Sequence, residues 1–150
     1  MASPHPTRVL VVTDRDAATP ALLDTIRGRA ARGAAEFRVL VPNPARAEWH
    51  VAHPLRHDKI TAAETVLAAA LPLIEQAAGH AVDGVVSIRH DPMDAIEETL
   101  LDSPFDEIIL ATAPHDLERW LHVDLPHRVA HLGLPVTTVT GEHRKARARE

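Results

Sequence analysis

The chain has 150 residues, and 45% of them are hydrophobic, which is enough for one domain with its own core. It contains no cysteine, which excludes disulfides, zinc–thiolate sites and thiol catalysis. The net charge is −5; because segment 142–150 carries four cations and two acids, the remaining body is about −7, which argues against nucleic acid as a partner.

No apolar run is long enough to cross a bilayer, and no signal-peptide pattern opens the sequence. We therefore expect a soluble, cytoplasmic protein with no membrane partner. Arginine far outnumbers lysine, which is typical of a GC-rich bacterial genome. The predicted organisation is one domain over residues 1–141, followed by a basic, flexible tail over 142–150.

Five short apolar runs, rich in β-branched residues and bounded by polar, Gly or Pro residues, predict strands. They cover residues 9–12, 37–41, 82–88, 108–110 and 136–139. The first and fourth runs are continuously apolar, as central strands covered on both faces should be.

Helical patterns lie between these runs. Thr19-Pro20 reads as an N-cap with a first-turn proline, and Gly33 as the stop of that helix. The capping box from Thr61 to Glu64 predicts the start of a long helix, with Pro72 inside it as a kink. Asp91-Pro92 begins a third helix with Met93, Ile96 and Leu100 facing inward, and Asp124 or Leu125 begins a fourth that Gly133 and Pro135 end.

This alternation predicts a single three-layer α/β/α domain with a five-stranded parallel sheet, a Rossmann-like α/β fold. Ligands in such folds bind at the carboxyl ends of the strands. The candidate ligand-binding residues are therefore Thr13, Asp14, Val41, Ala111, Thr112 and Ala113, with Pro42-Asn43 beside them. Segment 43–58 is the one long irregular connection that the pattern leaves.

Four stretches in order carry a family resemblance: "RVLVVTD", "RHDPMDAIEETL", "DEIILAT" and "RVAHLGLPVTTV". Together, over roughly residues 8–140, they resemble the universal stress protein family, within the adenine-nucleotide α-hydrolase-like superfamily. The resemblance implies a stress-related protein and a homodimer. The last run, "PVTTVT", is a candidate edge strand for that pairing.

ATP-binding members of this family carry Gly-x2-Gly-x9-Gly-Ser/Thr after the fourth strand. This chain keeps the spacing and replaces the residues: Ala111, Pro114, Asp124 and Leu125 stand at the four positions. Pro114 has no N–H for a phosphate, Leu125 has no hydroxyl, and the Asp124 carboxylate repels phosphate. We therefore expect that the chain does not bind ATP in the family's usual way.

Asp14 matches the first-strand aspartate that the resemblance places near the nucleoside end of the ligand. It leaves room for an uncharged or singly charged ligand, although the preferred interpretation is that it caps the turn into the first helix. Asp14 and Asp16 also resemble the acidic pair of a phosphorylated receiver domain, which needs a lysine after its last strand. The two lysines do not fit that role, because Lys59 opens the second helix and Lys145 lies in the tail.

Two histidine clusters have metal-ligand spacing: His50, His53 and His57 with Asp58, and the pair His127 and His131 with His122 and Asp124 nearby. Polar loop or surface histidines are the preferred interpretation of both, so no metal and no cofactor is expected. Trp120 stands in the loop after the fourth strand. It is either an interface anchor or a plug over the vacated crevice.

No catalytic constellation is readable, so the expected role is a non-enzymatic regulatory or interaction module, with a homodimer and an unidentified protein as partners. The first alternative is a stress protein that binds a nucleoside or another small ligand at the strand carboxyl ends. The second is an enzyme of the wider superfamily.

Overall fold

The computed structural model describes residues 6–13, 19–42, 56–87, 92–112 and 125–140. Five strands form one sheet: β1 (Thr7–Thr13), β2 (Ala35–Val41), β3 (Asp83–Val86), β4 (Glu107–Thr112) and β5 (Val136–Thr140). Their order is β3-β2-β1-β4-β5, and every neighbouring pair is parallel. The predicted strands and the parallel sheet are thus confirmed, with ends that differ by one or two residues.

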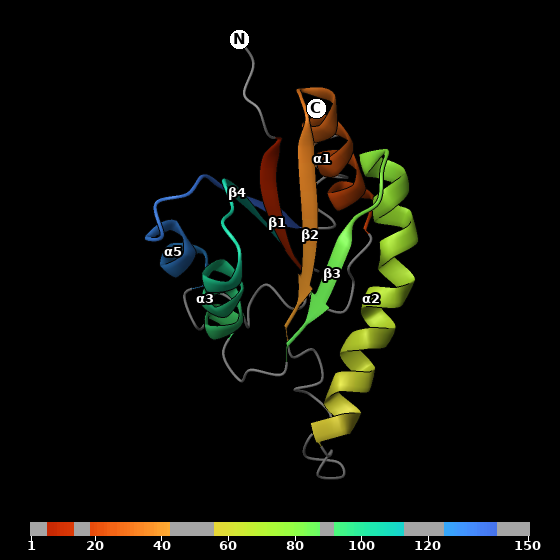
Figure 1. Cartoon of the computed structure of the whole chain (residues 1–150), viewed down its shortest axis with the longest axis vertical. Coiled ribbons are helices and arrows are strands. Elements are labelled where there is room, and N and C mark those ends of the chain that lie inside the picture. Colours follow the sequence, from red (N-terminus) through yellow and green to blue (C-terminus); the bar gives the residue numbers. More distant parts are fainter. Residues whose placement is uncertain (1–5, 14–18, 43–55, 88–91, 113–124, 141–150) are drawn as a thin grey trace.

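Four helices cover the sheet: α1 (Pro20–Ala31), α2 (Arg56–Ala78), α3 (Pro92–Asp102) and α5 (Leu125–Ala130). Figure 1 shows α1 and α2 on one face of the sheet and α3 and α5 on the other. The arrangement is the three-layer, Rossmann-like fold that the sequence predicts. In the part of the chain that the structure describes, no helix combines the length and the apolar character needed to span a membrane.

The core lies in two layers because successive side chains of a strand point to opposite faces. Val9 and Val11 of β1 pack with the side chains of α1 and α2, such as Ile26 and Ile74. Leu10 and Val12 pack with the residues of α3 and α5 on the other face. All four β1 side chains are fully buried, which explains why this strand reads as a continuous apolar run.

The helix ends follow local chemistry. The Thr19 hydroxyl accepts a hydrogen bond from the Leu22 N–H at 3.2 Å, so Thr19 caps α1 as predicted. Gly79 after α2 and Gly133 after α5 have φ values of 87° and 85°, a left-handed conformation that favours glycine.

The prediction for the start of α2 is wrong. The helix begins at Arg56, so Thr61 lies inside it and does not cap it, and residues 56–58 are helical and not part of an irregular connection. A serine or threonine caps a helix only where the preceding backbone leaves the helical conformation. Pro72 lies inside α2, as expected.

Helix α2 approaches β3 closely at Gly84. A Cβ atom at this position would lie 2.7 Å from Cδ1 of Leu67, nearer than real carbon atoms pack. A side chain at this position would have to displace the end of the Leu67 side chain, so the packing of the helix on the strand favours glycine, while its backbone conformation is ordinary.

Candidate functional site

The carboxyl ends of the central strands bring three of the predicted ligand residues together. Thr13 at the end of β1 is the register partner of Ala111 in β4. Val41 ends β2 on the other side of β1 and pairs with Val86 of β3. These three residues therefore form a continuous floor across the carboxyl edge of the sheet.

The floor is closed and mainly apolar. Thr13 and Val41 are fully buried, and Ala111 is 3% exposed. Pro42, the next residue after β2, is buried as well. Thr13 supplies the one side-chain hydroxyl among the three floor residues, so the floor can support a ligand by shape but offers little chemistry of its own.

The other predicted residues of this site fall largely outside the described residues. Asp14, Asn43, Ala113, Pro114, Trp120 and Asp124 are among them, as are the two loop histidines His50 and His53. Thr112 is described as the last residue of β4. The expectations for Asp14 as a ligand residue and for Trp120 as an anchor or plug therefore stay predictions, and so does the basic tail.

Leu125 is the motif position that the structure describes best. It is the first residue of α5, and it is completely buried in the core, with 0% of its surface accessible to solvent. It packs in the same apolar layer as Leu110 of β4 and Val129 of α5. A residue held in this way anchors the start of the helix against the sheet, and its side chain has no group to donate to a phosphate.

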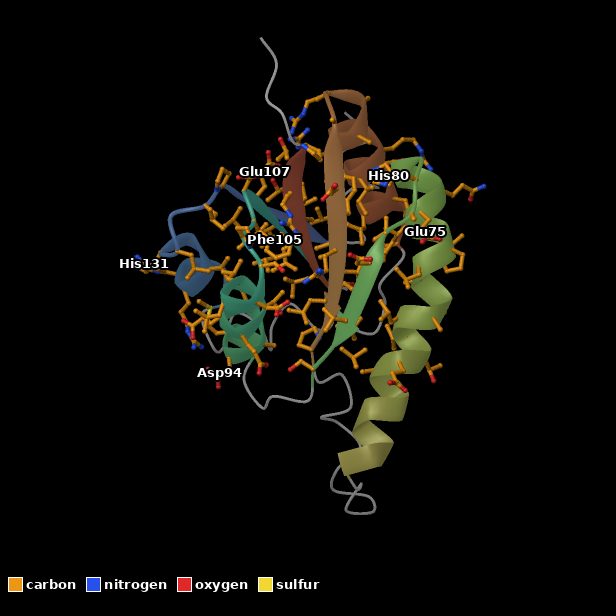
Figure 2. All side chains as sticks on the ribbon, viewed as in Figure 1. Glu75, His80, Asp94, Phe105, Glu107 and His131 are labelled. Atoms are coloured by element: carbon orange, nitrogen blue, oxygen red, sulfur yellow. The ribbon has the colours of Figure 1, made fainter. Side chains whose placement is uncertain are left out.

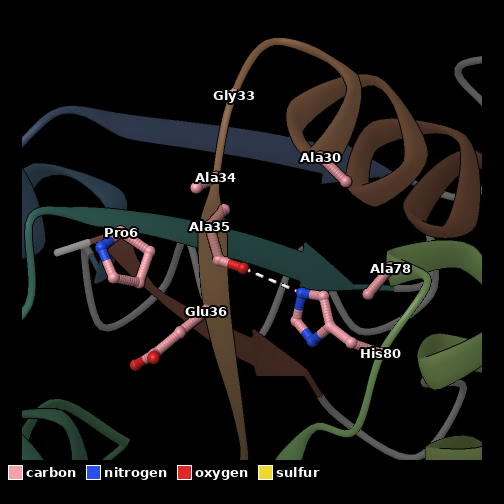
Figure 3. Close-up of a pocket in the computed structure, with 8 residues that line it drawn as sticks. All are labelled: Pro6, Ala30, Gly33, Ala34, Ala35, Glu36, Ala78 and His80. Atoms are coloured by element: carbon pink, nitrogen blue, oxygen red, sulfur yellow. Dashed lines mark hydrogen bonds between the residues drawn. The ribbon is translucent and has the colours of Figure 1, made fainter. Parts of the chain in front are cut away.

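A hollow of about 390 Å³ lies at the opposite edge of the sheet, beside the amino end of β2. Small residues such as Ala30, Gly33 and Ala78 line it, together with Glu36 and His80 (Figure 3). No pattern in the sequence predicts this hollow.

His80 closes one side of this hollow and links two parts of the chain. Its Nε2 lies 2.8 Å from the Ala35 carbonyl oxygen (Figure 3). Its Nδ1 lies 2.8 Å from the Ala81 carbonyl oxygen. The ring also stacks on Phe37, with 6.1 Å between centroids. Because both ring nitrogens face backbone oxygens, His80 holds the α2–β3 turn against β2 and is not placed to bind a ligand.

Sequence reasoning missed His80 because its partner, Ala35, is 45 residues away. One local signal was readable: Gly79 ends a helix, and the polar residue that follows such a stop often bonds to the chain nearby. Glu75 supports the same turn, since its Oε2 accepts from the Val82 N–H at 3.0 Å. Figure 2 shows Glu75 and His80 near each other at this end of α2.

The predicted pair His127 and His131 does share one face of α5 and the turn after it. Their Nε2 atoms are 2.8 Å apart, and both side chains are exposed. Of the loop cluster, His57 and Asp58 are described, as the second and third residues of α2. In the described ranges, no group of three or more His, Cys, Asp or Glu side chains is arranged to hold a metal ion.

Solved structures of known proteins resemble this fold. A universal stress protein from Archaeoglobus fulgidus has a similar structure, with a TM-score of 0.54 and 15% sequence identity over 89% of this chain and 93% of that one. The chain has a universal-stress-protein-like fold. No protein-family model and no curated protein matches the sequence. At this sequence identity the similarity establishes the fold alone, so function is inferred from the residues of this chain.

Proposed function

We propose that this protein is a non-enzymatic regulatory or interaction module with a universal-stress-protein-like fold that does not bind ATP. The observation that carries the proposal is the burial of Leu125 at the start of α5, where the resembled motif requires a hydroxyl for a phosphate. To recover that hydroxyl, the helix would have to lose an anchor of its core packing.

The other motif positions support the same conclusion. Ala111 is buried between Thr13 of β1 and Val139 of β5, where its methyl group adds bulk that a glycine would not. Pro114 has no N–H in any conformation. The Asp124 carboxylate repels a phosphate charge by about 1–4 kcal/mol at ~4 Å. Since about 1.4 kcal/mol is tenfold in affinity, this single residue weakens polyphosphate binding by about one to three decades.

The proposed module acts as a homodimer joined along β5. This strand is an edge of the described sheet, because β4 is its only neighbour in the strand order. The exposed side chains of this strand, Thr137 and Thr138, are uncharged, so they would not oppose pairing with a second copy. Trp120 is the proposed anchor for a further protein partner.

One alternative is the binding of a nucleoside or another uncharged ligand at the carboxyl ends of the strands. Thr13 is fully buried there, so Asp14, the next residue in sequence, would supply the polar contact. A nucleoside carries no phosphate and would avoid the repulsion by Asp124.

Thermal unfolding with equal concentrations of ATP, ADP, AMP and adenosine separates these functions. The proposed module gives the same Tm with all four. A rise with adenosine that is lost in Asp14→Asn would establish the nucleoside alternative. A rise that increases from AMP to ATP would show that the phosphates are bound, and it would overturn the proposal.

A further inference from the structure

The last turn of α5 and the turn after it hold two imidazoles unusually close together. The Nε2 atoms of His127 and His131 are 2.8 Å apart, and the ring centroids are 4.5 Å apart with 37° between the planes. An N–H of one ring must face the other ring's Nε2, because two lone pairs or two protons at this distance repel each other. At least one Nε2 lone pair is therefore directed into the space between the rings.

We propose that His127 and His131 form a two-histidine binding site for a borderline divalent cation, namely Cu²⁺, Ni²⁺ or Zn²⁺. Neutral imidazole nitrogen is the ligand that these ions share, while Mg²⁺ and Ca²⁺ require oxygen ligands. When the cation binds, the proton between the two Nε2 atoms moves to the Nδ1 of its own ring, so that both Nε2 lone pairs can bind the cation. Water fills the remaining coordination positions.

The distance between the two nitrogens fits this exchange. Zinc binds histidine nitrogen at about 2.0–2.1 Å, so two such ligands at angles from square to tetrahedral are about 2.8–3.4 Å apart. The observed separation of 2.8 Å lies at the lower end of this range, so the rings need to open by only a few tenths of an ångström. A side-chain rotation of that size leaves the backbone unchanged.

The backbone fixes the two rings on the same face before any cation arrives. The His131 N–H donates to the His127 carbonyl at 3.3 Å and to the Arg128 carbonyl at 3.2 Å, which continues the helical spacing past Ala130. Val129 lies between the two histidines in sequence and is fully buried, which fixes the rotation of this turn relative to the sheet. Because the site is organised in advance, binding costs little ordering.

The site is open to solvent and separate from the floor at the strand carboxyl ends. Both histidines are exposed, and Figure 2 shows His131 on the outer side of α5, away from the sheet. A cation bound there leaves coordination positions free for a ligand from solution.

Isothermal titration calorimetry tests the site. NiCl2, ZnCl2 or CuCl2 is titrated singly into the protein in a buffer that does not bind metals. We expect binding of one ion per chain, tightest for Cu²⁺, and no binding of Mg²⁺. His127→Gln and His131→Gln should each weaken the site by a factor of ten or more, because a single imidazole loses the chelate. Both positions are exposed, so the variants should keep the wild-type circular dichroism spectrum.

The chain has eleven histidines, so a matched control is needed. The double variant His50→Gln/His53→Gln removes two histidines of the other cluster and should bind as wild type does. Nitrogen NMR supplies a second readout: Zn²⁺ should shift the Nε2 signals of His127 and His131 together. Binding that survives His131→Gln but is lost in the loop double variant would overturn the proposal, and so would the absence of binding to wild type.

Discussion

Single side chains connect parts of this chain that lie far apart in sequence. Arg29 in α1 and Glu107 at the start of β4 form an ion pair in which Nε lies 3.0 Å from Oε1 and 3.2 Å from Oε2. Their side chains are only 11% and 27% exposed. His80 plays a similar part between β2 and the α2–β3 turn. No periodic pattern reveals such pairs, which is why the sequence could not predict them.

Glu107→Gln should lower the free energy of unfolding by about 1–3 kcal/mol, because it leaves the partly buried Arg29 guanidinium without its counter-charge. Urea unfolding measures the change. The matched control is Arg27→Ala, which removes an exposed ion pair with Asp24 and should cost less than about 1 kcal/mol. Equal losses in the two variants would show that burial of the Arg29 pair contributes nothing.

His80→Ala should lower the free energy of unfolding by about 1–2 kcal/mol, since it removes the ring contact to Phe37 and the bond to the Ala35 carbonyl. Gln76→Ala, at an exposed position of the preceding helix α2, is the control and should change stability by less than about 0.5 kcal/mol. A His80→Ala variant as stable as this control would contradict the structural role given to the ring.

At the scale of elements, the sequence predicted most of the fold because strands and helices differ in their period. The apolar runs became β1 to β5, and Met93 and Ile96 face the core from α3 as expected. The start of α2 was missed because a capping box is a local signal. Pro54, two residues before Arg56, was the stronger sign, since proline is disfavoured inside a helix.

The contact between α2 and β3 gives a prediction for a pair of residues. Gly84→Val should cost about 1–3 kcal/mol of stability, because its side chain would overlap Leu67. Leu67→Ala creates the missing space, so the double variant should lose at least about 0.5 kcal/mol less than the sum of the single variants. A thermodynamic cycle from urea unfolding measures this coupling, and strict additivity would show that the two residues do not meet.

For the whole molecule, the open edge at β5 determines how two copies would meet. Pro135 O accepts from Ile108 N at 3.0 Å, and in a parallel ladder every second residue faces the same neighbour. Thr138 therefore directs its N–H to the open edge. The Thr138→Pro monomer should fold, because proline is tolerated on edge strands, but it should lose pairing across β5.

Sedimentation velocity tests this geometry. Wild type and the control Thr138→Val, which keeps the N–H, should both sediment as dimers, while Thr138→Pro should sediment as a monomer with an unchanged circular dichroism spectrum. A dimeric Thr138→Pro would exclude the β5 edge as the interface.

The position of the candidate site could be predicted from the sequence, but the burial of its residues could not. Parallel register brings the carboxyl ends of β1, β2 and β4 to one edge, so Thr13, Val41 and Ala111 could be grouped from the sequence. Their nearly complete burial could not be read from it, because burial depends on how α1, α2, α3 and α5 close over both faces. The same closure buries Leu125.

Calorimetric titration of the wild-type protein with MgATP measures directly whether the chain binds ATP. We predict no saturable binding tighter than about 1 mM, because a buried leucine, a proline and a carboxylate stand where the resembled motif has the groups that hold phosphate. Binding of one MgATP per chain in the micromolar range, abolished by Asp14→Asn, would contradict it.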